Sequence, residues 1–278
     1  MNASFALRPA IPRPPVLRLS IVAAVVRREI LEIARNRALL IVLVLPPVLL
    51  VALPVIVTAL GGRQTLPPEL VATIVANRPD WAGLSLDQIS SAFAIQQMLI
   101  FFLLMPATIP LAIASYSIVG EKQTRSLEAV IAAPISTEEL LAGKAIAAIA
   151  PAVFTVWLAY VALIGIVWLA LGPALARIVL DPTWLAAVLA LGPAIGLVSI
   201  VAGIAISSRV NDPRAAQQIG TVIILPLVGF AVLQVQSGRL YTATDYLLAA
   251  TVVAAVGVAG LRVAARLFGR ETILTRWN

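Results

Sequence analysis

Residues 38–62 read ALLIVLVLPPVLLVALPVIVTALGG and contain no charged side chain. A helix of about 20 apolar residues spans the hydrocarbon core of a bilayer, which is about 30 Å thick. Five further charge-free runs follow, at residues 88–120, 145–176, 182–208, 215–238 and 246–261. Because lipid cannot satisfy bare backbone amides, such runs must be helical. We therefore predict an all-α integral membrane protein with six transmembrane helices.

The sixth run is short, with 16 residues. It reaches spanning length if Asp245 lies at one interface and Arg262 snorkels to the other. Hydrophobic residues make up 61% of the chain, and the mean hydropathy is +1.01. These values argue against the alternative of a very apolar soluble helical domain.

Basic residues are unevenly divided between the two sides that six spans define. Sixteen of the 20 Lys and Arg residues lie in the N-terminal arm, the second and fourth connections and the C-terminal tail. The other four are Arg63, Arg78, Arg177 and Arg239. Since basic loops stay in the cytoplasm, both termini are predicted to be cytoplasmic. The net charge of +7 then reflects topology and anionic lipid, and no nucleic-acid partner is expected.

The composition excludes several kinds of chemistry. The chain has no Cys and no His, which removes the common zinc, haem and iron–sulfur ligand sets. The only Gly-Lys pair, Gly143-Lys144, lacks the rest of a nucleotide-binding P-loop. No Asp, Glu, Lys or Arg lies inside a predicted span, which argues against an intramembrane enzyme and a proton- or sodium-driven carrier. We expect no enzymatic activity, metal or cofactor in this chain.

Residues 16–37 are predicted to form an amphipathic helix that lies in the membrane interface. Its apolar residues recur at spacings of three and four, at Leu19, Val22, Val26, Ile30 and Ile33. Arg28 and Glu32 lie on another face. Their mixed charge favours a protein partner over lipid alone, although a solvated face explains it equally well.

The rest of the chain divides by composition. Residues 1–15 form a flexible cytoplasmic arm rich in Pro and Arg, without the apolar core of a signal peptide, and residues 262–278 form a cytoplasmic tail. The six-helix domain covers residues 38–261, and its external connection is residues 61–92. Two short surface helices are expected in that connection, at 69–77 and 85–92.

The cytoplasmic coupling segment, residues 116–144, is the connection richest in motifs. Glu121 and Arg125 are four residues apart, a spacing that supports a helix. Ser136 and Glu139 form a capping box that begins the next helix. We predict an exposed amphipathic helix between two spans, which either transmits force from a docked partner or is a plain helical connection.

Polar and small residues mark the starts and the contact faces of the later helices. Asp181 and Asp212 each precede a proline and are predicted to cap helices, and Thr242 with Asp245 resembles a capping box. The fourth span carries a stripe of small residues, Gly192, Gly196, Ser199, Gly203 and Ser207. Such a stripe lets another helix approach closely, and we assign it to packing within the subunit. Helix bends are expected at three prolines, Pro106, Pro110 and Pro151.

The coupling segment reads SIVGEKQTRSLEAVIAAPISTEELLAGK over residues 117–144, and it resembles the permeases of type-2 ABC exporters. The shared pattern is a Gly-Glu-Lys start, a Ser-Leu-Glu core, a proline turn and a closing Gly-Lys. Two further stretches are similar to the same family, SSRVNDPRAAQQIG at residues 207–220 and RLFGRETILTRW at residues 266–277.

This resemblance implies a permease of the prokaryotic cytoplasmic (inner) membrane. It implies pairing with a second permease, identical or homologous, and with two separate ATPase subunits that bind ATP and Mg²⁺. It also implies that the ATPases dock on the interfacial helix and on the coupling segment. The residues expected to couple the ATPase to the permease are Gly120, Glu121, Lys122, Arg125, Glu128, Arg28 and Glu32.

The predicted spans offer mainly aliphatic side chains, with scattered polar groups at Gln96, Gln97, Thr108, Thr155, Tyr160 and Gln234. That composition favours export of a hydrophobic or amphipathic cargo between two permeases. The alternative is a non-transporting membrane anchor that recruits an ATPase to an envelope or signalling assembly. Cargo-stimulated ATP hydrolysis in vesicles separates the two functions.

Overall fold

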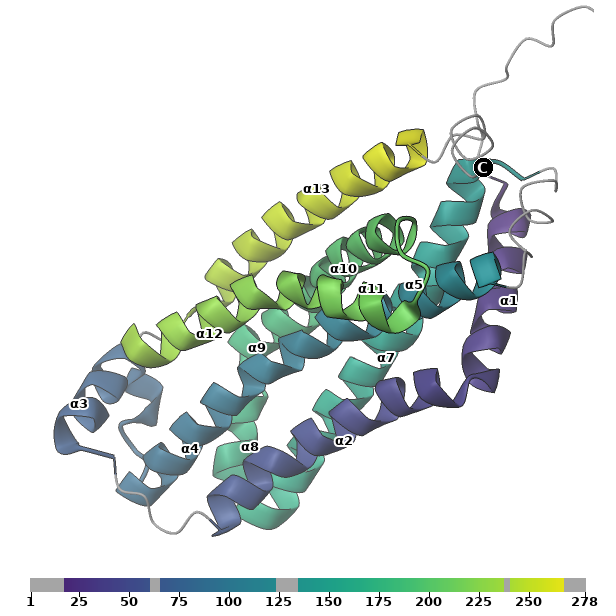
Figure 1. The fold of residues 1–278 in the computed structure, drawn as a ribbon. Coiled ribbons are helices and arrows are strands. Elements are labelled where there is room, and N and C mark those ends of the chain that lie inside the picture. Colours follow the sequence, from purple (N-terminus) through teal and green to yellow (C-terminus); the bar gives the residue numbers. More distant parts are fainter. Residues whose placement is uncertain (1–17, 61–65, 124–134, 238–240, 268–278) are drawn as a thin grey trace, which may run out of the picture.

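The structure, a computed structural model, describes residues 18–60, 66–123, 135–237 and 241–267. Within these residues the chain is helical and forms no strand. The elements are α1 (Leu19–Arg35), α2 (Arg37–Leu60), α3 (Pro68–Asn77), η1 (Pro79–Trp81), α4 (Leu86–Leu99), η2 (Ile100–Leu103), α5 (Leu104–Gln123), α7 (Thr137–Leu171), α8 (Pro173–Val179), α9 (Pro182–Ala186), η3 (Ala187–Leu191), α10 (Gly192–Ser207), α11 (Pro213–Gly220), η4 (Thr221–Ile223), α12 (Ile224–Ser237) and α13 (Ala243–Leu267). The long helices form an elongated bundle, and α1 lies across one end of it (Figure 1).

Five helical stretches in the described residues are long and apolar enough to cross a membrane. They are Arg37–Thr58, Leu86–Gln123, Glu138–Leu171, Pro173–Ser207 and Ala243–Ala264. These stretches support an integral membrane protein. The run predicted as the fifth span, residues 215–238, lies mainly on α11, η4 and α12 and is not among the five. Six spans and two cytoplasmic termini therefore stay predictions.

Three irregular turns interrupt the long helices, and each contains the residue four positions before a proline. These pairs are Phe102 in η2 with Pro106, Leu189 in η3 with Pro193, and Val222 in η4 with Pro226. Proline has no amide hydrogen, so the carbonyl four residues earlier loses its helical partner. A π turn at η3 and 3₁₀ turns at η2 and η4 accommodate the loss. The irregularity expected at Pro106 thus lies at η2, whereas α5 and α7 continue as helix through Pro110 and Pro151.

The predicted helix starts are confirmed. The capping box of Ser136 and Glu139 begins α7. Asp181 and Asp212 accept the backbone amides of Thr183 and Arg214, at the starts of α9 and α11. Thr242 and Asp245 exchange hydrogen bonds before α13.

The connection that was predicted to be external differs in part from its prediction. The expected helix at 69–77 is α3. The expected surface helix at 85–92 is not a separate element, because α4 begins at Leu86, after the cap at Ser85, and continues into the span Leu86–Gln123.

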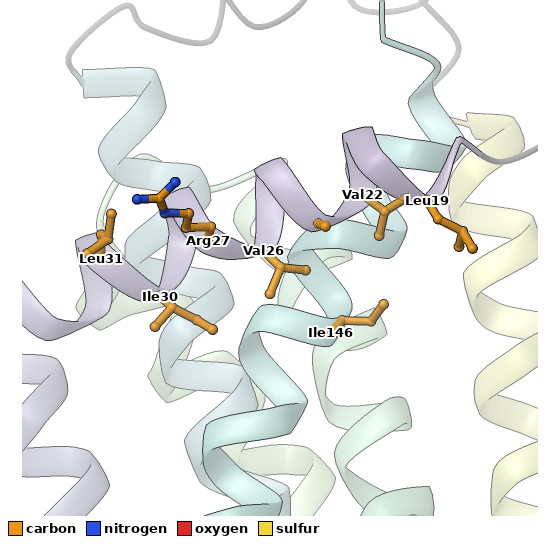
Figure 2. A pocket seen from close by; sticks show the side chains of 8 residues that line it. Leu19, Val22, Val26, Arg27, Ile30, Leu31 and Ile146 are labelled. Carbon is orange, nitrogen blue, oxygen red and sulfur yellow. The ribbon is translucent and has the colours of Figure 1, made fainter.

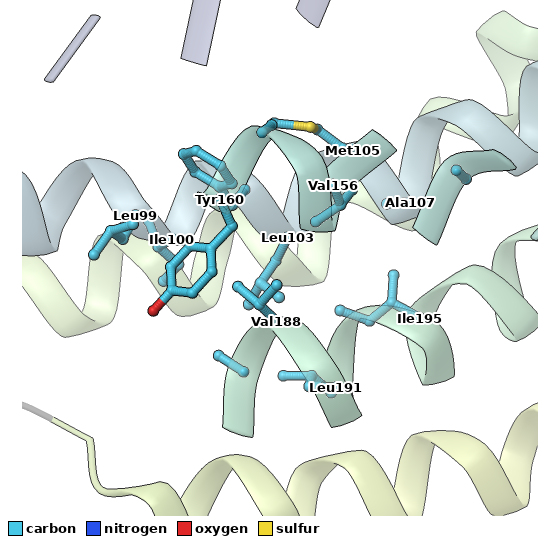
Figure 3. Packing of buried hydrophobic residues seen from close by; sticks show 14 of the residues in the cluster. Leu99, Ile100, Leu103, Met105, Ala107, Val156, Tyr160, Val188, Leu191 and Ile195 are labelled. Carbon is cyan, nitrogen blue, oxygen red and sulfur yellow. The ribbon is translucent and has the colours of Figure 1, made fainter. Parts of the chain in front are cut away.

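Helix α5 is mostly buried, and α10 packs closely along it. Ser199 donates its hydroxyl to the carbonyl oxygen of Ala107. A Cβ atom at Gly203 would lie 2.7 Å from the Cβ of Ala114, so a side chain at this position would force the helices apart. The small-residue stripe thus faces α5 of the same chain. Apolar side chains from η2, α5, α7, η3 and α10 fill the space beside this contact (Figure 3), including Leu103, Met105, Val156, Tyr160, Leu191 and Ile195.

The loops at the end of the bundle away from α1 are joined by an arginine (Figure 1). Arg78 donates hydrogen bonds of 2.9 and 2.8 Å to Asp80 and forms an ion pair with Asp181, before α9. Its guanidinium also lies 5.2 Å from the ring centroid of Trp81, which is buried. The connection before α4 and the connection between α8 and α9 therefore share one end of the bundle.

Candidate functional site

Helix α1 is held against α7 by a close backbone approach. Val22 and Ile33, on the apolar face of α1, are buried. A Cβ atom at Gly143 of α7 would lie only 2.6 Å from Cγ1 of Val25 and 3.4 Å from the carbonyl oxygen of Val22. Glycine at this position therefore allows the two helices to cross at this distance.

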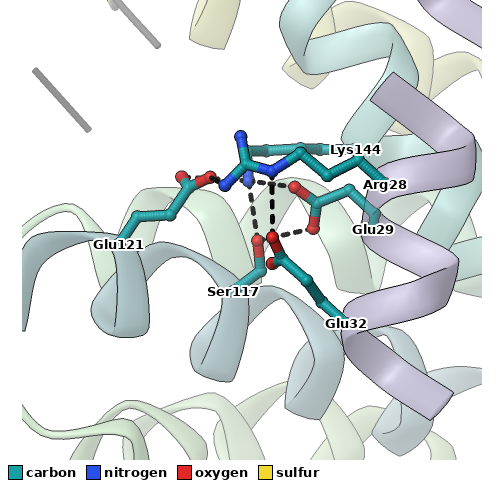
Figure 4. A network of polar contacts seen from close by, with 6 residues as sticks. All are labelled: Arg28, Glu29, Glu32, Ser117, Glu121 and Lys144. Carbon is teal, nitrogen blue, oxygen red and sulfur yellow. Dashed lines mark hydrogen bonds and ion pairs between the residues drawn. The ribbon is translucent and has the colours of Figure 1, made fainter. Parts of the chain in front are cut away.

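The next residue, Lys144, lies where α1, α5 and α7 meet (Figure 4). Its Nζ donates hydrogen bonds to Glu29 Oε1 and Ser117 Oγ, both at 2.7 Å, and lies 3.0 Å from Glu121 Oε2. Two of the three donors of the ammonium group are used in these hydrogen bonds, and the Glu121 carboxylate adds an ion pair. The side chains of Lys144, Glu29 and Glu121 are at most 6% exposed.

Further contacts extend this network to the surface of α1. Ser117 donates its hydroxyl to Glu29 Oε2 at 2.7 Å. Arg28 donates to Glu32 Oε1 at 2.9 Å and to Glu121 Oε1 at 3.3 Å, and both Arg28 and Glu32 are nearly half exposed. Partial burial lowers the pKa of Arg28, but the carboxylates around it outweigh this effect and raise the pKa above its ordinary value. The guanidinium therefore stays charged.

We call these six residues the junction network: Arg28, Glu29, Glu32, Ser117, Glu121 and Lys144. Burying charge costs free energy unless each charge is paired, and removing one member of a buried pair costs about 3–5 kcal/mol. The network therefore holds α1, α5 and α7 at a defined spacing. Within the described residues, no group of His, Cys, Asp and Glu is arranged to hold a metal ion.

A second ion pair joins the starts of α1 and α7. Arg18 donates from Nε and Nη2 to the two carboxylate oxygens of Glu139, both at 2.9 Å, and its backbone amide donates to the same carboxylate at 3.0 Å. Glu139 also accepts the backbone amide of Ser136 at 2.9 Å, as part of its capping box. One carboxylate thus both caps α7 and anchors α1.

Lys122 connects α5 to the end of α10. Its Nζ donates to the carbonyl oxygens of Ser207 and Ser208, both at 2.7 Å, and to that of Val210 at 3.3 Å. A cation is favourable at a helix C-terminus, where unpaired carbonyls carry partial negative charge. A displacement of α5 at this end would therefore be transmitted to α10.

One prediction about the coupling residues is wrong. Glu121 was expected on an exposed helix surface, but its side chain is 4% exposed and faces Lys144. Of the others, Arg28, Glu32 and Lys122 make the contacts described above, and a Cβ atom at Gly120 would have nothing within 4 Å. Arg125 and Glu128 lie outside the described residues. Whether any of them contacts an ATPase stays a prediction.

The sequence predictions missed four residues of this junction, Glu29, Ser117, Gly143 and Lys144. A signal for Glu29 is present in the chain: it follows Val22 and Val26 and precedes Ile33 at helical spacings. A carboxylate in the apolar stripe of a helix needs a buried cation, since an unpaired buried charge is rare. Lys144, directly before a charge-free run, is that cation.

The family comparison agrees with this architecture. The sequence model of a family described as ABC-2 family transporter protein matches residues 52–238, which is more than half of the chain. The match includes α5, α7 and α10 but not α1. No curated protein matches the chain. The chain belongs to the ABC-2 transporter family, whose members are transmembrane permease subunits of ABC transporters and are not themselves catalytic.

Proposed function

We propose that this permease subunit exports a hydrophobic or amphipathic cargo across a prokaryotic cytoplasmic membrane. The energy comes from two separate ATPase subunits, which hold ATP and Mg²⁺. The cargo crosses between this chain and a second copy or a homologous permease. Family membership supports the assignment of this chain as an ABC permease. The direction of transport, the cargo and the partners are what we propose beyond it.

The junction network is the observation that carries this proposal. It joins α1 to α5 and α7, and the connection between α5 and α7 leaves from the same end of the bundle. An ATPase that moves either α1 or this connection acts on all three helices together, because their contacts cannot separate without leaving buried charges unpaired. Lys122 extends the same movement to α10. Packed helices respond to such displacements by shifting as units.

The polar side chains of the spans support an apolar cargo. The hydroxyls of Thr108 and Thr155 donate to carbonyl oxygens of their own helices at 2.9 and 2.6 Å, and Tyr160 donates to the carbonyl of Val179. The buried amide nitrogen of Gln96 and both amide atoms of Gln97 have no hydrogen-bond partner within the described residues. The hydroxyls of Thr108, Thr155 and Tyr160 are therefore used within the chain, and the two glutamines are exceptions to this pattern.

A groove between α2 and α7 has the same character. Its volume is about 460 Å³, and its walls include Val48, Val51, Leu158 and Ile166. Sites of this size accommodate small apolar molecules. The groove supports a cargo with a hydrophobic body.

The test uses the full chain, co-expressed with the ABC ATPase of its own genome and reconstituted in liposomes with a panel of fluorescent amphiphiles. Glu128→Lys reverses a charge in the coupling segment. Glu69→Lys makes the same reversal on α3, at the opposite end of the bundle. We expect Glu128→Lys to lose the ATPase on purification or to uncouple hydrolysis from transport, and Glu69→Lys to leave both unchanged.

Two outcomes contradict the proposal in different ways. Normal coupled transport by Glu128→Lys would show that the ATPase does not dock on the coupling segment. Stable ATPase binding without cargo-stimulated hydrolysis or amphiphile movement would favour the membrane anchor instead.

A further inference from the structure

A hollow of about 540 Å³ lies between α1 and the start of α7. Its walls are apolar side chains of α1, Ile146 of α7, and one cation, Arg27. Figure 2 shows Val26 and Ile30 pointing below the helix, on the side where Ile146 lies, with Arg27 at the edge away from Leu19. The hollow is separate from the junction network, whose residues do not line it.

Most of the apolar side chains that line this hollow are exposed. Leu19 is 79% exposed, Ile30 43% and Ile146 48%. Contiguous apolar surface of this kind normally marks a site that contacts another molecule or the membrane. The volume lies within the range of about 300–1,000 Å³ that is usual for ligand sites. The hollow therefore suits an apolar occupant.

Arg27 gives the hollow its charge. Two neighbouring arginines are paired, Arg18 with Glu139 and Arg28 with Glu32 and Glu121. Arg27 is exposed and has no carboxylate partner among the described residues. An unpaired guanidinium above an apolar hollow is complementary to a molecule with an anionic head and an apolar body.

An exposed apolar row leads away from the hollow along α7. Ile146, Ala150, Phe154 and Leu158 follow at four-residue spacing and are all exposed. Leu158 lies twelve positions after Ile146, a rise of about 18 Å along the helix. Half of a bilayer core is about 15 Å thick. The row therefore has the length of one acyl chain in one leaflet.

We propose that an anionic phospholipid, from the leaflet at this end of the bundle, occupies the hollow. Its phosphate binds Arg27, and one acyl chain follows the row from Ile146 to Leu158. The lipid fills the space under α1 beside the Gly143 crossing and so stabilises α1 on α7. A protein partner fits less well, because the hollow continues into the exposed apolar row of α7, which lies in the candidate membrane span Glu138–Leu171. The proposal does not depend on transport.

Native mass spectrometry of the delipidated full-length chain tests this site. The chain is titrated with phosphatidylglycerol or phosphatidylcholine of identical acyl chains. We expect the first phosphatidylglycerol to bind about fivefold more tightly, the effect of one arginine near an anionic lipid. Arg27→Gln removes this preference, whereas Arg35→Gln, an exposed position of α1 outside the hollow, keeps it. Ala23→Phe narrows the hollow without changing charge and weakens both lipids.

Three results would overturn the proposal. The first is equal binding of the two lipids by the unaltered chain. The second is a preference for phosphatidylglycerol that stays unchanged in Arg27→Gln, or that is lost equally in Arg35→Gln. An equal loss in Arg35→Gln would mean that the preference depends on the overall charge of α1. The third is loss of a copurifying ATPase in Arg27→Gln with lipid binding unchanged, which would assign this face to a protein. Circular dichroism and melting temperature establish that each variant is folded before the titration.

Discussion

Replacing Lys144 with methionine tests the junction network directly. The substitution keeps a long side chain but removes the cation that Glu29, Ser117 and Glu121 share. The two carboxylates are each 4% exposed and would face one another without this counter-charge. Breaking a buried ion pair by removing one partner costs about 3–5 kcal/mol. We expect Lys144→Met to lower the free energy of unfolding by that amount.

The assay is reversible unfolding in mixed micelles, followed by the fluorescence of the five tryptophans and by circular dichroism. Glu32→Gln is the matched control, because it removes a nearly half-exposed carboxylate of the same network. Exposed pairs contribute about 0.2–1 kcal/mol. A triple variant that adds Glu29→Gln and Glu121→Gln to Lys144→Met should recover much of the lost stability, since no unpaired charge remains buried. A loss of stability in Lys144→Met no larger than that in Glu32→Gln would show that Lys144 is not the essential counter-charge of the network.

Three further predictions concern packing, pH and topology. Gly203→Ala should destabilise the chain by about 1–3 kcal/mol, because the new methyl group meets Ala114. Gly165→Ala is the control, because a Cβ atom at Gly165 meets nothing within 4 Å, and it should stabilise the chain by up to about 1 kcal/mol. Equal unfolding curves for the two variants would count against the α5–α10 contact. The hydrogen bond from Arg78 lowers the pKa of Asp80 in the folded chain. This contact therefore stabilises the fold fully above about pH 3.9, the pKa of an aspartate in the unfolded chain, and the stabilisation is lost as the pH falls through the lower pKa of the folded state. The melting-temperature difference between the unaltered chain and Asp80→Asn should therefore be constant from about pH 5 to 8 and shrink below about pH 4; a difference that persists at pH 2 would contradict this assignment. Single cysteines are clean probes because the chain has none: an impermeant reagent added outside cells should label Ser85→Cys and not Asn211→Cys, and the reverse pattern would invert the topology.

The local features of the fold follow from the sequence because they depend on neighbouring residues. Charge-free runs predict helices wherever lipid must surround the backbone. Each predicted cap involves residues a few positions apart, as in Ser136 with Glu139 or Thr242 with Asp245, and these caps are confirmed. The stripe of small residues from Gly192 to Ser207 likewise predicts a close helix contact, although the sequence does not indicate that α5 is the helix that packs on it.

The candidate site depends on contacts between residues far apart in the chain. Glu121 lies in a polar stretch, and its spacing to Arg125 is equally consistent with an exposed helix. Its burial results from α1 crossing α7 at Gly143, which brings Glu29 beside Lys144, 115 residues later. No local pattern specifies this crossing. The charge of Glu29 in an apolar stripe indicates that a buried cation is needed, but not which one.

The positions of the irregular helical turns are also only partly predictable from local sequence. The missing amide of Pro106 predicts a disturbance, and η2 contains the carbonyl that lost its partner. Pro110 and Pro151 have the same local chemistry, yet α5 and α7 remain helical around them. Whether a proline changes the helix type is decided by the packing around it, which the sequence pattern alone does not contain.

In the proposed mechanism, a separate ATPase drives this permease from the end of the bundle that carries α1. Photo-crosslinking from a benzoylphenylalanine side chain measures this most directly, with the probe at Glu138, exposed in the first turn of α7, and in a second variant at Ser85, before α4. We expect an adduct with an ABC ATPase from Glu138 and none from Ser85. An ATPase adduct from Ser85, or none from Glu138 in a functional complex, would contradict it.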